Sequence, residues 1–414
     1  MTEELKKSIG PGLIMAAAAI GVSHLVQSTR AGADFGFALV WAVVLANLFK
    51  YPFLEFGPRY AIATGNHMIH GYAKLGRIPL WIFIVFTVGS MFAVLAAVTI
   101  VTASLAAELT GITLSPQLWS GIVLALCVSL LIRGSYAILD GIIKFFMVLL
   151  AVSTVIAVVA ALFQTGVAAE SASASPELWS AAGFAFLIAL MGWMPIPVDA
   201  SVWHSIWTLE REKQTRYKPT LKESLLDFNI GYIGAAVIAL LFLSLGALIL
   251  HGSGTDFAAS GGAFSKQLIS LYTLTLGDWS YAIIVICAFS TMFSTTFAVA
   301  DTYPRVCAIL IETVRPNRRF STTQWYRILL ISISTVAFLI LVYAGDHFRL
   351  LIDFATSLSF LMAPVLAYLN IRLILGRDIP DKFRPKPWLR ILAYSGLLFL
   401  TGFALATVFW LLFL

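Results

Sequence analysis

Long apolar runs recur from one end of this 414-residue chain to the other. A helix of about 20 mostly apolar residues crosses the hydrocarbon core of a bilayer, and these runs have that length. The pattern therefore predicts an all-α polytopic membrane protein with about eleven transmembrane helices, whose ends are fixed only to within a few residues. We place them at residues 12–33, 36–62, 80–110, 115–132, 138–164, 178–208, 226–250, 279–311, 325–344, 350–374 and 391–414.

Two of these runs are interrupted near their centres. The run Gly10–Arg30 carries the sequence Gly-Val-Ser-His at 21–24, and the run Leu178–Trp207 carries Gly-Trp-Met-Pro-Ile-Pro-Val-Asp at 192–199. Proline removes a backbone donor and breaks a helix, and freed backbone groups inside a bilayer are tolerated only where protein or a water-filled cavity receives them. Paired interrupted helices in the two halves of a chain indicate the substrate site of a transporter.

The spacing of the two breaks predicts an internal repeat. The interrupted runs are the first and the sixth, so each begins a unit of five helices. A unit with an odd number of crossings must be followed by a copy of opposite orientation, which makes the arrangement a 5+5 inverted repeat. We expect the first repeat at 1–164, the second at 165–374, and a cytoplasmic loop with an extra eleventh helix at 375–414.

Composition and charge agree with a membrane location. Hydrophobic residues make up 60% of the chain and charged residues 12%, against about 25% charged in soluble domains. Most of the 27 lysines and arginines fall in alternate loops, which predicts a cytoplasmic N-terminus and an extracytoplasmic C-terminus. We expect an integral protein of the lipid bilayer, in a bacterial plasma membrane. The net charge of +6 is then a topology signal, and no nucleic-acid partner is expected. Oligomeric state stays open, with a monomer among the options.

Several short motifs together resemble the Nramp family of divalent-metal transporters. They are Gly10-Pro11-Gly12-Leu13, the block Ala31–Phe37, the block Arg59–Gly65 and the pair Met194-Pro195. The resemblance covers nearly the whole chain. It implies a LeuT-type fold in which helices 1 and 6 are broken and the substrate binds between them.

The chain departs from the family where the family binds its metal. The family's Asp-Pro-Gly-Asn in helix 1 corresponds to residues 21–24, so the aspartate is replaced by Gly21 and the asparagine by His24. Its Met-Pro-His in helix 6 becomes Met194-Pro195-Ile196, and a glutamine of helix 10 corresponds to Thr356. The substrate-binding residues that we infer from the breaks and the resemblance are Gly21, Ser23, His24, Trp193, Met194, Pro195 and Thr356.

The altered motif leaves two kinds of substrate open. His24 and Met194, with carbonyls freed at the breaks, offer soft ligands that suit transition metals more than Mg²⁺. Our first expectation is therefore transport of a metal ion of the Mn/Fe/Mg class, with His24 and Met194 as its ligands. The alternative is a small organic cation or a neutral solute, because an uncharged gap beside Trp193 could accept either. A relative that binds without transporting is a third option.

Two carboxylates inside the expected spans are candidates for proton coupling or for a replacement counter-charge. An ionisable residue within a membrane is a functional hypothesis by default. Asp199 follows the second break, and Asp301 lies late in the eighth span after a stripe of serine and threonine. Salt-bridged structural roles are the alternative for both. Glu55 and Arg59 are four residues apart and predict a structural ion pair.

Enzymatic functions fit poorly. The chain contains no P-loop pattern and no His-Glu-x-x-His, so ATP-driven transport and metalloprotease activity are not indicated. We expect no cofactor other than a transported divalent metal. Secondary transport by alternating access is predicted, with helices 1, 2, 6 and 7 rocking against the rest. Its energy would come from an ion gradient or the membrane potential, with proton symport and uncoupled facilitation both open.

Overall fold

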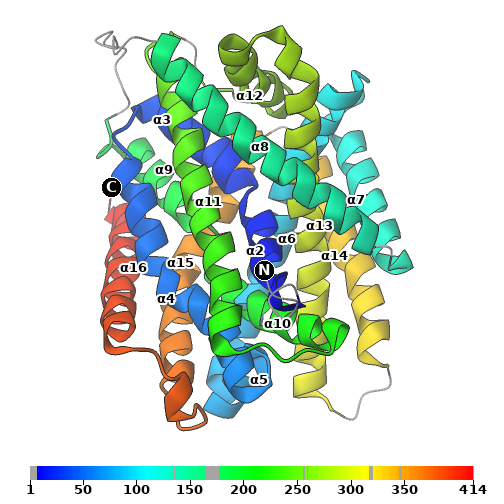
Figure 1. The fold of residues 1–414 in the computed structure, drawn as a ribbon, viewed down its shortest axis with the longest axis vertical. Helices are drawn as coiled ribbons and strands as arrows, with labels where there is room; N and C mark the ends of the chain where they lie inside the picture. Colours follow the sequence, from blue (N-terminus) through cyan, green and yellow to red (C-terminus); the bar gives the residue numbers. More distant parts are fainter. Residues whose placement is uncertain are drawn as a thin grey trace.

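The protein is described by a computed structural model. It covers residues 7–134, 136–164, 177–254, 257–258, 260–316, 320–344 and 347–413. Over these ranges every regular element is a helix, which agrees with the all-α prediction. The bundle is elongated, with α5 (Met68–Leu75) near one end of its long axis and α12 (Gly261–Leu276) at the other (Figure 1). We refer to these as the α5 end and the α12 end.

The first half of the chain forms one interrupted helix and several continuous ones. The interrupted helix consists of α2, the π-helical turn η1 and α3, and the expected break at its centre is present. The elements are α2 (Pro11–Ala19), η1 (Ser23–Ser28), α3 (Thr29–Phe35), α4 (Val40–Thr64), α5, α6 (Arg77–Thr110), α7 (Pro116–Arg133) and α8 (Tyr136–Gln164).

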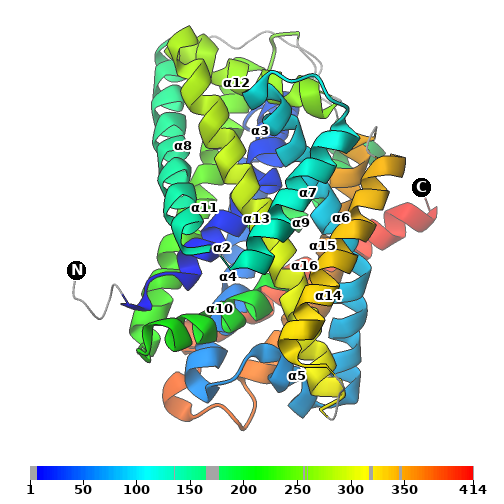
Figure 2. The same cartoon turned by 90° about the vertical axis from the view of Figure 1, so that its right-hand side faces the viewer.

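The second half begins with another interrupted helix, α9 followed by α10. Residues 193–199 between them are not α-helical. In both ribbon views α10 lies across the long axis of the bundle (Figures 1 and 2). The elements are α9 (Ala181–Gly192), α10 (Ala200–Thr215), α11 (Leu221–Ile249), α12, α13 (Tyr281–Val314), α14 (Thr322–Ala344), α15 (Phe348–Ile374) and α16 (Pro387–Phe413).

These helices account for the expected spans. Among the described residues eight helices are long and apolar enough to cross a membrane, and the pair α2 and η1–α3, bent by 47°, makes a ninth. The remaining two are α4, which carries three charged residues, and the broken pair α9/α10. The expected fold, about eleven spans with the first and sixth broken, is confirmed. The boundary expected at residue 165 lies outside the described residues, so the domain division stays a prediction.

Glycines end several of the continuous helices. Gly65, Gly111 and Gly134 adopt φ of 67°, 67° and 70° directly after α4, α6 and α7. A residue without Cβ takes this left-handed conformation without strain, and its N–H then satisfies a carbonyl of the last turn. At the other kind of boundary, the side chain of Thr220 and that of Glu223 form a reciprocal capping box that begins α11.

Helix α11 holds both pieces of the interrupted first helix through backbone contacts. A Cβ placed on Gly231 would lie 2.0 Å from the carbonyl oxygen of Gly12, and one placed on Gly32 would lie 2.0 Å from that of Leu243. Small residues allow helices in a membrane to approach this closely. The Asp227 carboxylate of α11 also accepts hydrogen bonds from the backbone of Gly10 (3.0 Å) and Gly12 (2.6 Å) at the start of α2.

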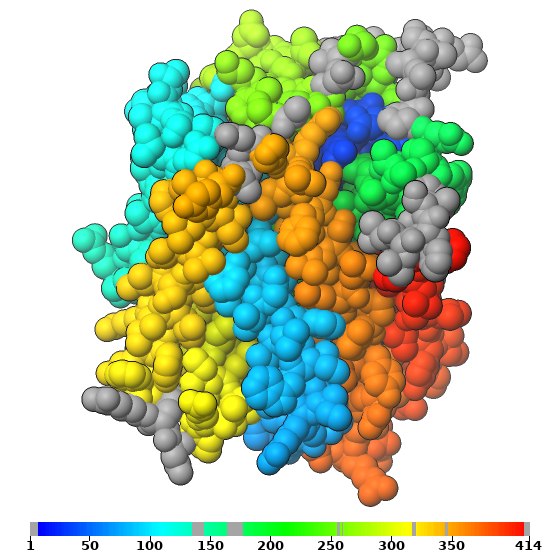
Figure 3. Space-filling view, turned by 180° about the vertical axis from the view of Figure 1, so that it is seen from behind, coloured from blue at the N-terminus to red at the C-terminus, as the bar shows by residue number. Residues whose placement is uncertain are grey.

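The second interrupted helix is held on both sides of its break. Gly57 of α4 lies against α10, since a Cβ there would be 2.2 Å from the carbonyl oxygen of Ser201. Gly192, the last residue of α9, lies against α15, since a Cβ there would be 2.0 Å from the carbonyl oxygen of Thr356. The two breaks are thus fixed in position by neighbouring helices. On the face opposite to that seen in Figure 1, α14, α6 and α15 lie side by side, with α16 at the edge (Figure 3).

Candidate substrate site at the paired helix breaks

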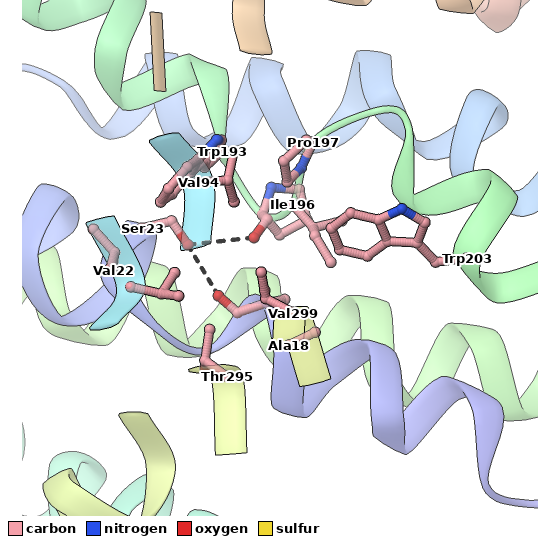
Figure 4. Close-up of a pocket in the computed structure, with 13 residues that line it drawn as sticks. Ala18, Val22, Ser23, Val94, Trp193, Ile196, Pro197, Trp203, Thr295 and Val299 are labelled. Carbon is pink, nitrogen blue, oxygen red and sulfur yellow. Dashed lines mark hydrogen bonds between the residues drawn. The ribbon is translucent and has the colours of Figure 1, made fainter. Parts of the chain in front are cut away.

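The two helix breaks meet at one small cavity inside the bundle (Figure 4). The volume open to the centre of a water molecule is about 20 Å³, which is room for about one water. Its walls come from α2, the following turn and the start of η1, the α9–α10 connection, α10, α6 and α13. They consist of Ala18, Ala19, Val22, Ser23, Val94, Val98, Trp193, Pro195, Ile196, Pro197, Trp203, Thr295 and Val299.

Ser23 links the two breaks. Its Oγ lies 3.0 Å from the carbonyl oxygen of Ala19 and 3.4 Å from that of Pro195, and both contacts are drawn in Figure 4. The same Oγ lies 2.7 Å from Nδ1 of His24. A hydroxyl has one proton, so Ser23 can donate to only one of these acceptors at a time. Ser23 thus lies within hydrogen-bond distance of the Pro195 carbonyl at the second break, and His24 competes with that carbonyl for its proton.

His24 is fully buried, and both of its ring nitrogens have partners. Nε2 lies 2.9 Å from the carbonyl oxygen of Ala235 in α11, and Nδ1 faces Ser23. A carbonyl can only accept, so Nε2 carries the proton and, in the neutral ring, Nδ1 accepts from the Ser23 hydroxyl. To bind a metal, His24 would have to give up one of these bonds. It is not among the residues that line the cavity.

The hydroxyl of Thr295 on α13 is a hydrogen-bond donor for carbonyl oxygens freed at the first break. Its Oγ1 lies 2.9 Å from the carbonyl oxygen of Ala17 and 3.3 Å from that of Ile20. Gly21 packs against the same side chain, because a Cβ there would lie 2.7 Å from Thr295. The Ser-Thr stripe of α13, for which helix–helix hydrogen bonding is the expected role, thus supports the unwound segment through Thr295.

The expected residues of the sixth span divide between the cavity and its surroundings. Pro195 and Trp193 line the cavity, and Nε1 of Trp193 donates to the Ser359 hydroxyl at 2.8 Å. Met194 is fully buried but is not a lining residue. Thr356 is also buried away from the cavity, and its hydroxyl bonds to carbonyls of its own helix. The roles of these residues remain predictions.

The two candidate carboxylates lie in two other cavities. Asp199, at the start of α10, lines a narrow space with Thr87, Ser90 and Ser359, and that space would admit a single water. Asp301 lines a cavity of about 430 Å³ between α2, α7, α10, α13 and α14. The structure therefore does not bring the two carboxylates together, nor does it bring either one to the wall of the cavity at the breaks.

Asp301 already has two partners. It forms an ion pair with Arg305 at 2.8 Å and accepts a hydrogen bond from the Tyr326 hydroxyl at 2.6 Å. Its charge is thus balanced within the same cavity, which fits the structural alternative. The expected pair of Glu55 and Arg59 is present, with Nε of Arg59 donating to Oε2 of Glu55 at 2.8 Å.

No metal-binding cluster accompanies the breaks. In the described part of the chain no three side chains of histidine, cysteine, aspartate or glutamate gather closely enough to hold a metal ion. Cys127, Cys287 and Cys307 are buried and free.

An ion pair joins α3 to α15 on the α12 side of the first break. Arg30, in the first turn of α3, lies with Nη1 2.9 Å from Oδ2 of Asp353 in α15. Gln27 donates to the same carboxylate at 2.9 Å. The Arg30 guanidinium also stacks 4.4 Å above the ring of Phe186 in α9. These contacts join the first interrupted helix to α15 and to α9.

Sequence reasoning overlooked Lys50, which lies next to the second break. This side chain on α4 is fully buried, and its Nζ donates to the carbonyl oxygens of Met191 (2.6 Å) and Gly192 (2.7 Å) at the end of α9. A signal was present, since Lys50 is the only lysine in the apolar run 36–62. The rule that intramembrane charges mark functional positions applies to it as it does to Asp199.

The comparisons with known proteins agree with this architecture. The family model described as "Natural resistance-associated macrophage protein-like" matches residues 12–410. The chain belongs to the Nramp family. An uncharacterized protein of Pasteurella multocida is 35% identical to this Nramp chain over 417 residues, covering 98% of it and 94% of the relative. Members of the Nramp family are secondary transporters of the membrane, which places this chain among transporters rather than enzymes.

Solved structures show the same fold at low sequence identity. A manganese transporter of Eremococcus coleocola, in complex with an aromatic bis-isothiourea compound, has a TM-score of 0.70 at 16% identity and covers 98% of this Nramp chain and 86% of its own. MhsT in complex with L-phenylalanine has a TM-score of 0.63 at 15% identity, covering 96% and 98%. The recognition of an Nramp-type chain with a LeuT-type fold is confirmed.

Proposed function

We propose that this Nramp-family member carries a small organic solute without positive charge, by alternating access at the paired breaks. The observation that carries the proposal is the lining of the cavity. It is apolar apart from the hydroxyls of Ser23 and Thr295, the indole N–H groups of Trp193 and Trp203 and the backbone, and it contains no carboxylate. An uncompensated metal ion or organic cation in such surroundings would lose its hydration without gaining a counter-charge.

The indole rings of Trp193 and Trp203 favour an organic substrate. Both lie in the cavity wall on the side of the second interrupted helix (Figure 4). Aromatic faces bind apolar and planar groups, and binding pockets for small molecules combine such walls with a few placed hydrogen-bonding groups. Here the hydroxyl of Ser23 and the carbonyl oxygen of Pro195 would supply that polar recognition. The cavity as it stands must widen before a solute larger than water can enter.

Metal transport is the second candidate. Family membership favours it, as does the likeness of the fold to structures described as manganese transporters. The ligands available at the breaks would be the Met194 thioether, freed carbonyls, and His24 after the loss of one hydrogen bond. This donor set holds no fixed negative charge and suits a soft ion better than Mg²⁺.

The tight backbone contacts support the expected moving unit. Helices α2, α3 and α11 touch through glycines, and α4 touches α10 in the same way. These elements are the first, second, sixth and seventh spans, and their contacts leave little freedom for them to move separately. We propose that they rock together, with the ion pair of Arg30 and Asp353 opening when the α12 end becomes accessible.

We also propose the orientation and location that the sequence predicts. The α5 end would face the cytoplasm of a bacterium, with the N-terminus inside and the C-terminus outside. The division into repeats at 1–164 and 165–374 and a final unit at 375–414 goes with this topology. Proton coupling through Asp199 stays a hypothesis alongside uncoupled facilitation.

Uptake into proteoliposomes tests the proposed substrate class. Purified protein is reconstituted and offered Mn²⁺ and Fe²⁺ in one set of assays and radiolabelled neutral amides, amino acids and nucleobases in another. Saturable uptake of an organic solute, with no movement of metal, is the expected result. Ser23→Ala should reduce that uptake at least tenfold, whereas the matched control Ser332→Ala, exposed on α14, should leave it unchanged. Saturable metal uptake would reverse the assignment.

A further inference from the structure

We infer that the ammonium group of Lys50 is a built-in cation that occupies the place of a bound ion at the end of α9. It would allow the carrier to work without an alkali or divalent ion at this position. The inference rests on the proposed function, because it concerns the same pair of helix breaks. It adds a charged group that faces the second break from α4.

The carbonyl groups at the end of α9 form a cation-binding position. The last carbonyls of a helix have no partners within the helix, and the helix dipole gives that end a partial negative charge. Pro195, four residues after Met191, lacks the N–H that would satisfy the Met191 carbonyl, and because residues 193–199 are not α-helical the Gly192 carbonyl lies at the end of the last helical turn. The oxygens of Met191 and Gly192 are therefore available, and backbone carbonyls are common ligands of alkali and alkaline-earth ions.

Lys50 fills this position with its own charge. Its Nζ lies 2.6 Å from the oxygen of Met191 and 2.7 Å from that of Gly192, and the side chain is 0% exposed. Oxygen ligands hold Ca²⁺ at about 2.3–2.6 Å, so an ion bound to these carbonyls would need the space that the ammonium group takes. The lysine and a bound cation are mutually exclusive here.

The charges around the second break balance without an added ion. Asp199 lies beyond the break, directly before α10, and supplies a carboxyl group on that side of it. An ammonium group and a carboxylate then leave the region neutral. A metal ion placed between them would be repelled by the ammonium group, and the charge of the nearest carboxylate would already be balanced by that group.

An apolar side chain would be the simpler choice if α4 only needed to pack here. Burying an ammonium group is costly unless it is paired and hydrogen-bonded, and a methionine would fill the same volume without that cost. The cost is met at this position because the freed carbonyls require a donor or a cation. Lys50 therefore acts as a specificity-determining residue that keeps cations out of the break.

Thermal unfolding of the purified full-length chain tests this inference. The melting temperature is measured in choline chloride, NaCl, KCl and MnCl2 at equal ionic strength, for the wild type, Lys50→Met and the control Lys74→Met. Lys74 is a half-exposed lysine on α5 that pairs with Asp378. We expect the wild type and Lys74→Met to respond equally to all four salts.

Lys50→Met should melt at a lower temperature in choline and be stabilised saturably by Na⁺ or K⁺, by about 2–4 °C, as its vacated carbonyls bind the ion. Lys50→Gln, which keeps donors without charge, should behave in the same direction. A saturable response of the wild type to Na⁺ or K⁺ would overturn the inference. The inference would also be overturned if Lys50→Met and Lys50→Gln fold but their melting temperatures do not respond to any cation, or if no salt raises the melting temperature that these substitutions lower.

These outcomes separate the inference from the proposed function. If the wild type binds and transports Mn²⁺, the neutral-solute function fails together with the role of Lys50. If the wild type ignores every cation and transports an organic solute, but Lys50→Met gains no cation response, only the inference about Lys50 fails.

Discussion

Asp353 accepts hydrogen bonds from Nη1 of Arg30 through both of its carboxylate oxygens, at 3.1 and 2.9 Å. The two residues lie on α15 and α3, so the contact ties the α3 piece of the first interrupted helix to the helix that also packs on α9. Their side chains are 16% and 31% exposed, so water screens the pair only in part. We propose that this contact, in which one nitrogen bonds both carboxylate oxygens, closes the route from the cavity to the α12 end.

Loss of this ion pair should open that route. In a variant without the three natural cysteines, Ser23→Cys places a thiol in the wall of the cavity. Adding Asp353→Asn should weaken the closed state by about 1 kcal/mol and speed labelling by a thiosulfonate reagent roughly fivefold. Asp378→Asn, which removes the exposed partner of Lys74 at the α5 end, should not change the rate. Equal labelling rates in all variants would contradict the gate.

On α11, an added methyl group should disrupt the contact with α2 at Gly231 but be tolerated at Gly234, three residues later. A Cβ on Gly231 would lie 2.0 Å from the carbonyl oxygen of Gly12, whereas one on Gly234 would meet nothing within 4 Å. Gly231→Ala should therefore lower the free energy of unfolding by about 1–3 kcal/mol through overpacking. Gly234→Ala should leave it unchanged or raise it by up to about 1 kcal/mol, because alanine favours a helix. Melting temperatures of the two variants check the contrast, and a Gly231→Ala protein as stable as Gly234→Ala would show that the helices can separate freely.

Stability at the α5 end should fall in acid because of His67. This residue caps α5, where its Nδ1 accepts the backbone N–H of His70 at 3.2 Å. Burial, with the nearby charges of His70 and Lys213, lowers the pKa of His67 from 6.5 to about 4. The folded state thus favours the neutral ring, and stability that is present above pH 6.5 is lost as the pH falls toward 4.

The expected slope is about 1 kcal/mol per pH unit at most, since one unit of pKa corresponds to 1.36 kcal/mol. His67→Asn keeps a capping oxygen but does not titrate in this range, so it should remove this part of the pH dependence of the melting temperature. His347→Gln serves as the control because this histidine lies before α15 near the α12 end and its side chain makes no capping hydrogen bond. An unchanged acid profile in His67→Asn would rule out His67 as the cause.

The sequence predicted the architecture well because its signals are local. Apolar runs mark the spans, and Pro195 and Pro197 mark the second break without reference to any other helix. The odd number of crossings between breaks then predicts the inverted arrangement. The pair of Glu55 and Arg59 was equally predictable, because both residues lie on one face of one helix.

The site was less predictable because its partners are distant in the sequence. The carbonyl oxygen that occupies Nε2 of His24 belongs to Ala235, and the hydroxyl that supports the first break belongs to Thr295. Nothing near His24 in the sequence shows that its ring is already bonded. Lys50 was detectable as a charge within an apolar run, but its target on α9 becomes evident only when α4 and α9 are placed side by side.

The glycine contacts along α11 also restrict how the protein can be inhibited. Because their peptide groups are in direct contact, with no side chains between them to compress, α11, α2 and α3 should move together as one rigid unit. If this unit rocks as proposed, a compound bound between α11 and a helix outside the unit should block transport without contacting the substrate site.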